Sequence, residues 1–230
     1  DEANAKAMRE SLEKIEATFP VVVRSWIDGE EGEGGSGTFE STDPSQTSRI
    51  VANSAKCSRD DALRAVVGAH KAFGEWAAKT PDQRAEYLFQ AARLMRLRKH
   101  DFSAMMVYEV GKSWAEADGD TAEAIDFMEF YAREALRYGR PQPITPHAVE
   151  KNELHYVPLG VGAVIPPWNF PVAILIGMLS ATLVSGNCAI LKPASDTPVV
   201  AARFMQLLQE VGLPAGVVSF LPGRGSEVGE

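Results

Sequence analysis

An asparagine lies at the start of a long apolar run. Residues 166–174 read PPWNFPVAI, and mostly apolar residues continue to 186. The primary amide of Asn169 suits two tasks. As the cap of a following helix, its oxygen accepts a hydrogen bond from a backbone N–H. As an oxyanion donor, its NH2 stabilises charge developing on a reacting oxygen, an effect worth about 3–4 kcal/mol. The surrounding residues leave both interpretations open.

Two other stretches carry groups that suit a dinucleotide. In LKPASDTP, Lys192 ends a short apolar run, and its ammonium either meets an acceptor such as a ribose hydroxyl or extends to solvent. PGRGSEVGE has glycines at 223, 225 and 229, which let backbone approach a pyrophosphate. Its spacing departs from GxGxxG, so an ordinary glycine-rich turn explains it equally well. The glycines of 32–37 lie among glutamates, which repel phosphate, so we expect no phosphate loop there.

Each of the three stretches follows or ends a predicted strand. Strands are expected at 155–167, 188–193 and 216–222, with helices over 170–185 and 197–211 between them. This alternation predicts a parallel sheet with right-handed crossovers, as in a Rossmann-like fold. Ligands of such sheets bind at the carboxyl ends of the strands, so the three stretches should meet there. The strand at 217–221 is expected to form an unpaired edge.

The first half of the chain is predicted to be mainly helical. A β-hairpin arm at about 21–55, turning at Asp28-Gly29, precedes helices over 59–78, 81–99, 101–110 and 113–137. The proline-rich GRPQPITP (139–146) then marks a boundary. We therefore expect an α/β protein with a helical part over 1–145 and the first part of a dinucleotide-binding domain over 146–230.

Composition excludes several classes of protein. The 230 residues carry a net charge of −8, which disfavours nucleic acid as a partner. Two cysteines and four scattered histidines form no disulfide framework and no metal-ligand spacing, so no metal is expected. The absence of a disulfide framework favours a reducing, cytoplasmic setting. No apolar stretch is long enough to span a membrane, and residues 1–10 lack an apolar signal core. The missing initiator Met and the abrupt end at Glu230 suggest a piece of a longer chain.

Three stretches in this order resemble the aldehyde dehydrogenase superfamily: GVGAVIPPWNFPVAI, GNCAILKPASDTP and GLPAGVVSFLPGRGSEVG. EVGKSWAEADGDTAEAIDFMEFYAREAL (109–136) is more particularly similar to the 1-pyrroline-5-carboxylate dehydrogenase branch. Members of that branch oxidise glutamate γ-semialdehyde to glutamate with NAD, alone or within a bifunctional proline-utilisation protein. The resemblance covers essentially the whole chain.

The resemblance implies roles for particular residues. Asn169 matches the oxyanion-stabilising amide, which favours the donor over the cap. Glu116 and Phe170 are candidate substrate residues, although an ordinary exposed helix glutamate explains Glu116 equally well. Many members carry glutamate three residues after the ribose-binding lysine, where Ser195 stands here; a carboxylate there repels a 2′-phosphate, so NADP is not excluded. The implied cofactor-binding residues are Ile165, Pro166, Pro167, Trp168, Lys192, Ser195, Gly225 and Gly229.

The nucleophile and the general base of the family lie downstream of these stretches. In the family a cysteine thiolate attacks the aldehyde, hydride passes to the nicotinamide, and a glutamate-activated water releases the acid. Cys188 stands inside an apolar strand, where burial raises a thiol pKa, so it is predicted to be core. The 230-residue chain alone is therefore expected to be inactive, with the remaining catalytic portion, a small aldehyde and further copies of itself as partners. The alternatives are a non-catalytic dinucleotide-binding or oligomerising fragment, and a dehydrogenase for another semialdehyde.

Overall fold

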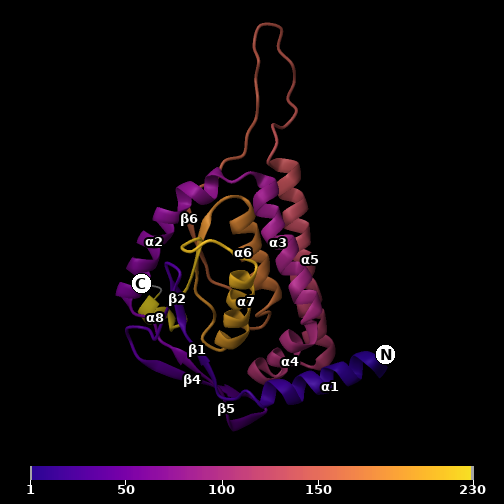
Figure 1. The fold of residues 1–230 in the computed structure, drawn as a ribbon, viewed down its shortest axis with the longest axis vertical. Coiled ribbons are helices and arrows are strands. Elements are labelled where there is room, and N and C mark those ends of the chain that lie inside the picture. The colour runs from indigo at the N-terminus through magenta and orange to yellow at the C-terminus, as the bar shows by residue number, and fades with distance from the viewer. Residues whose placement is uncertain (1, 229–230) are drawn as a thin grey trace.

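The computed structural model describes residues 2–228, and the half before residue 139 is mainly helical (Figure 1). Its helices are α1 (Glu2–Glu16), α2 (Arg59–Ala78), α3 (Pro81–Leu97), α4 (Lys99–Val110) and α5 (Trp114–Tyr138). Ser58 begins α2, Thr80 begins α3 and Ser113 begins α5, each through a capping box that satisfies backbone N–H groups of the first turn. The predicted helices of this half are confirmed.

The strands form two sheets. The three-stranded sheet has the order β1-β5-β4, and the five-stranded sheet has the order β3-β2-β8-β7-β6. The first sheet comprises β1 (Val21–Val23), β5 (Gln46–Ala55) and β4 (Thr38–Asp43). The second comprises β3 (Glu30–Gly32), β2 (Ser25–Ile27), β8 (Val218–Phe220), β7 (Cys188–Leu191) and β6 (Val161–Val164).

The parallel part of the larger sheet confirms the predicted βαβαβ unit. β6 pairs in parallel with β7, and β7 with β8. The crossovers contain α6 (Ala173–Val184) and α7 (Pro198–Glu210), and the short α8 (Gly225–Val228) follows β8. The first strand is shorter than expected, because residues 155–160 precede it as irregular chain that includes Pro158, which has no N–H, and Gly160 at φ +128°.

The expected unpaired edge at 217–221 is wrong. β2 lies antiparallel to β8, with Trp26 opposite Phe220, and continues the sheet through its own hairpin partner β3. Asp28 and Gly29, at φ 51° and 87°, form the predicted tight turn of this hairpin. Residues 21–55 hold more than this hairpin, because β5 pairs with β1 on one side and with β4 on the other in a separate sheet.

Helices from both halves of the chain cover the larger sheet. α2 contacts β2, β6, β7 and β8, whereas α6 contacts β6 and β7 and packs against α3 and α5. α6 is buried over most of its surface, as expected for an apolar helix between a sheet and other helices. A Cβ at Gly177 of α6 would lie 3.0 Å from the Phe127 ring of α5, so glycine permits this close packing.

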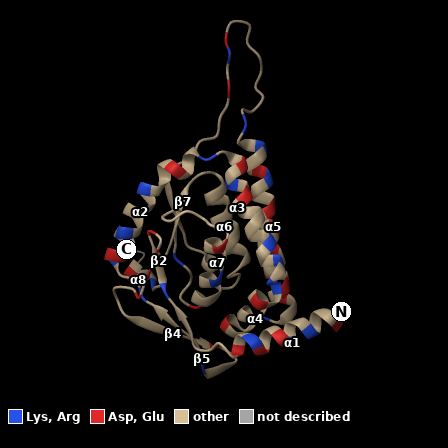
Figure 2. Cartoon of the chain, viewed as in Figure 1, with Lys and Arg blue, Asp and Glu red and all other residues tan. Residues whose placement is uncertain are grey.

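The outer surface differs from this apolar interior. Lys, Arg, Asp and Glu all lie along α3 and α5 (Figure 2), although the charged residues of α5 from 116 to 129 are all acidic. Residues 139–160 project from the body as a long loop, held by isolated bridges between Gln142 and Leu154 and between His147 and Glu150 (Figure 1). Within residues 2–228, no helix combines the length and apolar character required to cross a bilayer.

Candidate active site

Hydrogen bonds join the carboxyl ends of the three parallel strands. The Lys192 N–H donates to the Val164 carbonyl at 3.0 Å, and the Leu221 N–H donates to the Leu191 carbonyl at 2.9 Å. The Ser195 hydroxyl then donates to the Gly223 carbonyl at 3.2 Å, which joins the second loop to the third. The loops that carry the candidate residues therefore converge at the carboxyl ends of the parallel strands.

Asn169 does not cap the helix that follows it. α6 begins at Ala173, its N-cap residue is Val172, and no side chain of its own caps it. Asn169 is solvent-exposed, and its side chain has no hydrogen-bond partner among the residues described. The amide is therefore available to donate to an oxygen outside the chain.

A cavity of about 560 Å³ opens beside Asn169. Phe170 forms part of its wall, next to the Lys112 ammonium, which lies 4.2 Å from the centroid of the Phe170 ring. Glu116 and Asp120 line it from α5. The two candidate substrate residues and the candidate oxyanion donor therefore share one cavity.

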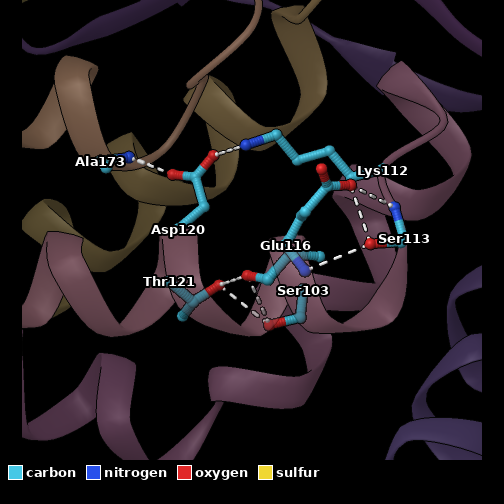
Figure 3. A network of polar contacts seen from close by, with 8 residues as sticks. Ser103, Lys112, Ser113, Glu116, Asp120, Thr121 and Ala173 are labelled. Carbon is cyan, nitrogen blue, oxygen red and sulfur yellow. Dashed lines mark hydrogen bonds and ion pairs between the residues drawn. The ribbon is translucent and has the colours of Figure 1, made fainter.

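Glu116 has a structural task as well as a place in this wall. It forms the capping box of α5 with Ser113, whose hydroxyl donates to the Glu116 carboxylate at 2.8 Å and whose N–H donates at 3.2 Å (Figure 3). These bonds lower the pKa of Glu116, so its carboxylate is ionised at neutral pH. The side chain is exposed, and a cationic group entering the cavity would meet a negative charge there.

Lys192 lies at the end of β7 with a partly buried side chain. Burial lowers its pKa. Its ammonium donates to the Pro193 carbonyl at 3.0 Å, which leaves two of its three N–H donors without a hydrogen-bond partner in residues 2–228. A pair of ribose hydroxyls would satisfy those donors, so the geometry fits the adenosine end of a dinucleotide.

The third loop has one glycine fixed by the fold and one that faces open space. Gly223 has φ +156°, and a Cβ there would lie 2.6 Å from Val228 Cγ2. A Cβ at Gly225 would meet nothing within 4 Å, so packing within the described chain does not require glycine there. Open backbone at Gly225 suits the approach of a ligand. Gly229 lies outside the described residues.

The loop residues of the first strand lie in different surroundings. Ile165, Pro167 and Trp168 are exposed and Pro166 is buried. Trp168 and Ser195 also line a second cavity of about 520 Å³. This cavity is bordered by the acidic residues Glu40, Glu109 and Asp196. The negative charges of Glu40 and Asp196 disfavour phosphate in this second cavity.

Neither cysteine is suited to attack a substrate. Both are fully buried. Burial raises the pKa of Cys188 to about 11, and burial with the charge of Asp61 raises the pKa of Cys57 to about 12. Thiols at these pKa values are protonated at neutral pH. Within residues 2–228, no three His, Cys, Asp or Glu residues are grouped so that they could hold a metal ion.

Two buried carboxyl groups beside the loops were missed from the sequence. Asp120 accepts a hydrogen bond from the Ala173 N–H at 2.6 Å. Glu109 accepts from the N–H groups of Val199 at 2.6 Å and Val200 at 3.0 Å. Burial raises the pKa of Glu109 to about 8, although both backbone bonds act to lower it. Each carboxyl group caps the helix that follows one of the site loops.

Known proteins share this arrangement of strands, helices and loops. Residues 30–230 match the model of the aldehyde dehydrogenase family. The chain is 48% identical over its whole length to a 1-pyrroline-5-carboxylate dehydrogenase of Bacillus mycoides (strain KBAB4), and it spans 44% of that relative.

Solved structures agree with the sequence comparison. A 1-pyrroline-5-carboxylate dehydrogenase from Thermus with bound NAD superposes with a TM-score of 0.95 at 46% identity, over 100% of this chain and 44% of that one. Proline utilization A from Bdellovibrio bacteriovorus, inactivated by N-propargylglycine, gives a TM-score of 0.96 at 39% identity, over 100% of this chain and 24% of that one. The chain belongs to the aldehyde dehydrogenase family.

Proposed function

We propose that this chain supplies the oxyanion donor and one half of the dinucleotide cleft of an NAD-linked dehydrogenase that oxidises glutamate γ-semialdehyde to glutamate. One observation carries the proposal. The amide of Asn169 is exposed, does not cap α6, and borders a cavity of about 560 Å³ at the carboxyl ends of the parallel strands. Catalysis in this proposal requires a nucleophile and a base from a downstream segment, consistent with the 44% of the relatives that the chain spans.

Asn169 would act on the aldehyde oxygen. When a nucleophile adds to the carbonyl, negative charge develops on that oxygen, and an amide N–H positioned near it stabilises the charge. Because Asn169 has no competing hydrogen bond within residues 2–228, its NH2 need not give up a partner before it donates. A donor that acts on the transition state in this way contributes to kcat rather than to cofactor affinity.

The cofactor would lie across the loops after β7 and β8. Bound nicotinamide dinucleotide supplies the hydride acceptor. Lys192 would donate to the adenosine ribose, and the open backbone at Gly225 would allow close approach of the adenine and pyrophosphate part. NAD is the proposed cofactor because the similar Thermus enzyme binds it. Ser195, which brings no negative charge to the ribose, leaves NADP as an alternative.

The proposed substrate follows from the names of the relatives and from the charge of the cavity wall. Glutamate γ-semialdehyde carries an α-ammonium group. The ionised Glu116 carboxylate would attract that group, while Phe170 would border the aliphatic part of the substrate. A homo-oligomer, a cytoplasmic location and the division at residues 145 and 146 remain predictions.

The test uses this chain together with its downstream segment. Asn169→Ala is expected to lower kcat by about 10²–10³-fold, measured as NADH formation from glutamate γ-semialdehyde, with little change in NAD affinity. Asn152→Ala, on the projecting loop, is the control and should keep full activity. Unchanged turnover in Asn169→Ala would refute the oxyanion role, and equal turnover of succinate semialdehyde would refute the substrate assignment.

The same assay on the 230-residue chain alone tests its proposed dependence on the missing portion. The high pKa values of Cys57 and Cys188 predict no NADH formation. Activity should return when the downstream polypeptide is added. If it does not return while the chain still binds NAD, a non-catalytic dinucleotide-binding fragment becomes the better description.

A further inference from the structure

The first turn of α6 is capped by a residue from another helix. A helix begins with N–H groups that lack partners within the helix. α6 has no side-chain cap of its own, and its N-cap residue is the apolar Val172. The Asp120 carboxylate on α5 fills this role by accepting from the Ala173 N–H at 2.6 Å (Figure 3). This contact connects α5 with the end of the loop that carries Asn169.

The other oxygen of Asp120 is paired with Lys112. The Lys112 ammonium lies 2.5 Å from the Asp120 carboxylate, whose side chain is 0% exposed, whereas that of Lys112 is 12% exposed. A buried charge is tolerated when it is both paired and hydrogen-bonded, as it is here. Loss of either partner would leave the remaining charge buried, so the pair fixes the geometry closely.

Lys112 contacts the same loop at a second point. Its ammonium lies 4.2 Å from the centroid of the Phe170 ring, within the range of a cation–π interaction. The Asp120–Lys112 pair therefore contacts the loop at the residue directly after Asn169 and again at Ala173. Asn169 itself has no hydrogen bond to the described residues that could hold its amide in place.

We propose that Asp120, together with Lys112, is a positioning residue that sets where the Asn169 amide points. This inference rests on the proposed oxyanion role of Asn169. Asp120 acts through the backbone of α6 and the Phe170 ring, and it touches neither the substrate oxygen nor the cofactor. Because displacement of a catalytic group by about 1 Å can cost about 10²-fold in rate, loss of this anchor should lower kcat by about 10–100-fold.

The experiment is a double-mutant cycle in the protein that contains the downstream segment. Asp120→Ala, Asn169→Ala and the double variant are compared in kcat and in the dissociation constant for NAD. Asp120→Ala alone is expected to lower kcat by about 10–100-fold with NAD affinity unchanged. In the Asn169→Ala background the same substitution should change kcat by less than about threefold, because residues that act as a unit are not additive.

Two further variants separate positioning from general stability. Asp118→Asn removes a carboxylate on the same helix that pairs with Lys99 at 3.1 Å. Within residues 2–228 Asp118 has no hydrogen bond or ion pair to the Asn169 loop, so kcat should be unchanged. Asp120→Asn keeps an oxygen for the Ala173 N–H and should recover part of the kcat lost in Asp120→Ala. Asp120→Asn also serves in the cycle if Asp120→Ala does not fold.

The outcomes distinguish this inference from the function on which it rests. Equal losses of kcat from the Asp120 substitution with and without Asn169 would overturn the positioning role, as would an unchanged kcat in the single variant. An unchanged kcat in Asn169→Ala alone would instead overturn the oxyanion role itself, and the positioning role with it.

Discussion

Glu109 predicts an unusual dependence of stability on pH. Its carboxyl group is 3% exposed and accepts two backbone N–H groups at the start of α7. Burial raises its pKa from 4.5 to about 8, so burial outweighs the two hydrogen bonds and the charge of Arg203, which favour ionisation. In the folded chain Glu109 therefore holds its proton to about pH 8, whereas in the unfolded chain it loses it near pH 4.5.

The sign of the effect follows from proton uptake. Between pH 4.5 and 8 the folded state binds one more proton at Glu109 than the unfolded state, so the free energy of unfolding falls as pH rises. The contribution is fully present below pH 4.5 and is lost as pH approaches 8. Each pH unit in this range lowers the free energy of unfolding by about 1.4 kcal/mol, so Glu109 lowers it by about 2–3 kcal/mol between about pH 6 and 8.

The assay is equilibrium urea unfolding of wild type and Glu109→Gln across this range. Gln resembles the neutral acid and has no proton to lose, so the variant should gain about 2–3 kcal/mol relative to wild type from about pH 6 to 8. Glu86→Gln, at an exposed position on α3, makes the same change in charge and should run parallel to wild type. If the free energy of unfolding of Glu109→Gln also follows that of wild type across this pH range, Glu109 is ionised in the folded chain.

Three other outcomes are expected. Lys192→Ala should raise the dissociation constant for NAD by more than it lowers kcat, measured by calorimetry and turnover; normal affinity would refute the ribose contact. Asp61 accepts hydrogen bonds from Ser58 and Gly35, which outweigh burial and lower its pKa to about 2. Asp61→Asn should therefore lower the free energy of unfolding by about 2–3 kcal/mol at neutral pH. The difference between variant and wild type should vanish as pH falls from 3.8 to 2. Residues 146–230 expressed alone should aggregate, because they lack β2 and α2; a stable monomer would show that neither is needed.

Local signals were sufficient to predict most elements of the fold. Capping residues and apolar periodicity placed the helices to within a few residues, and the alternation of strand and helix predicted the parallel pairing. The β2–β8 pairing was missed because it joins three-residue strands far apart in sequence through Trp26 and Phe220. No local pattern distinguishes such a strand from an independent hairpin.

The candidate site, like the fold, was predicted only in part from the sequence. The three loops and their convergence followed from the rule for open α/β sheets, whereas the residues that hold the loops did not. A signal for Asp120 was present, because it lies three residues after Ala117 and four before Ala124, on the buried stripe of α5. Glu109 likewise follows the buried Met105 by four residues on α4. Charged residues are mostly exposed, but one that falls on the buried face of a helix is expected to be buried and paired.

Each site loop is held by the helical half of the chain. Asp120 on α5 caps the helix after the Asn169 loop, and Glu109 on α4 caps the helix after the Lys192 loop. The third loop is fixed where the Cys57 N–H, just before α2, donates to the Pro222 carbonyl at 2.9 Å. The two halves, which the proline-rich segment separates in sequence, are therefore joined by hydrogen bonds in the folded chain. Hydrogen bonds from the helical half reach the first turns of α6 and α7, which follow the Asn169 and Lys192 loops, and they reach the third loop itself.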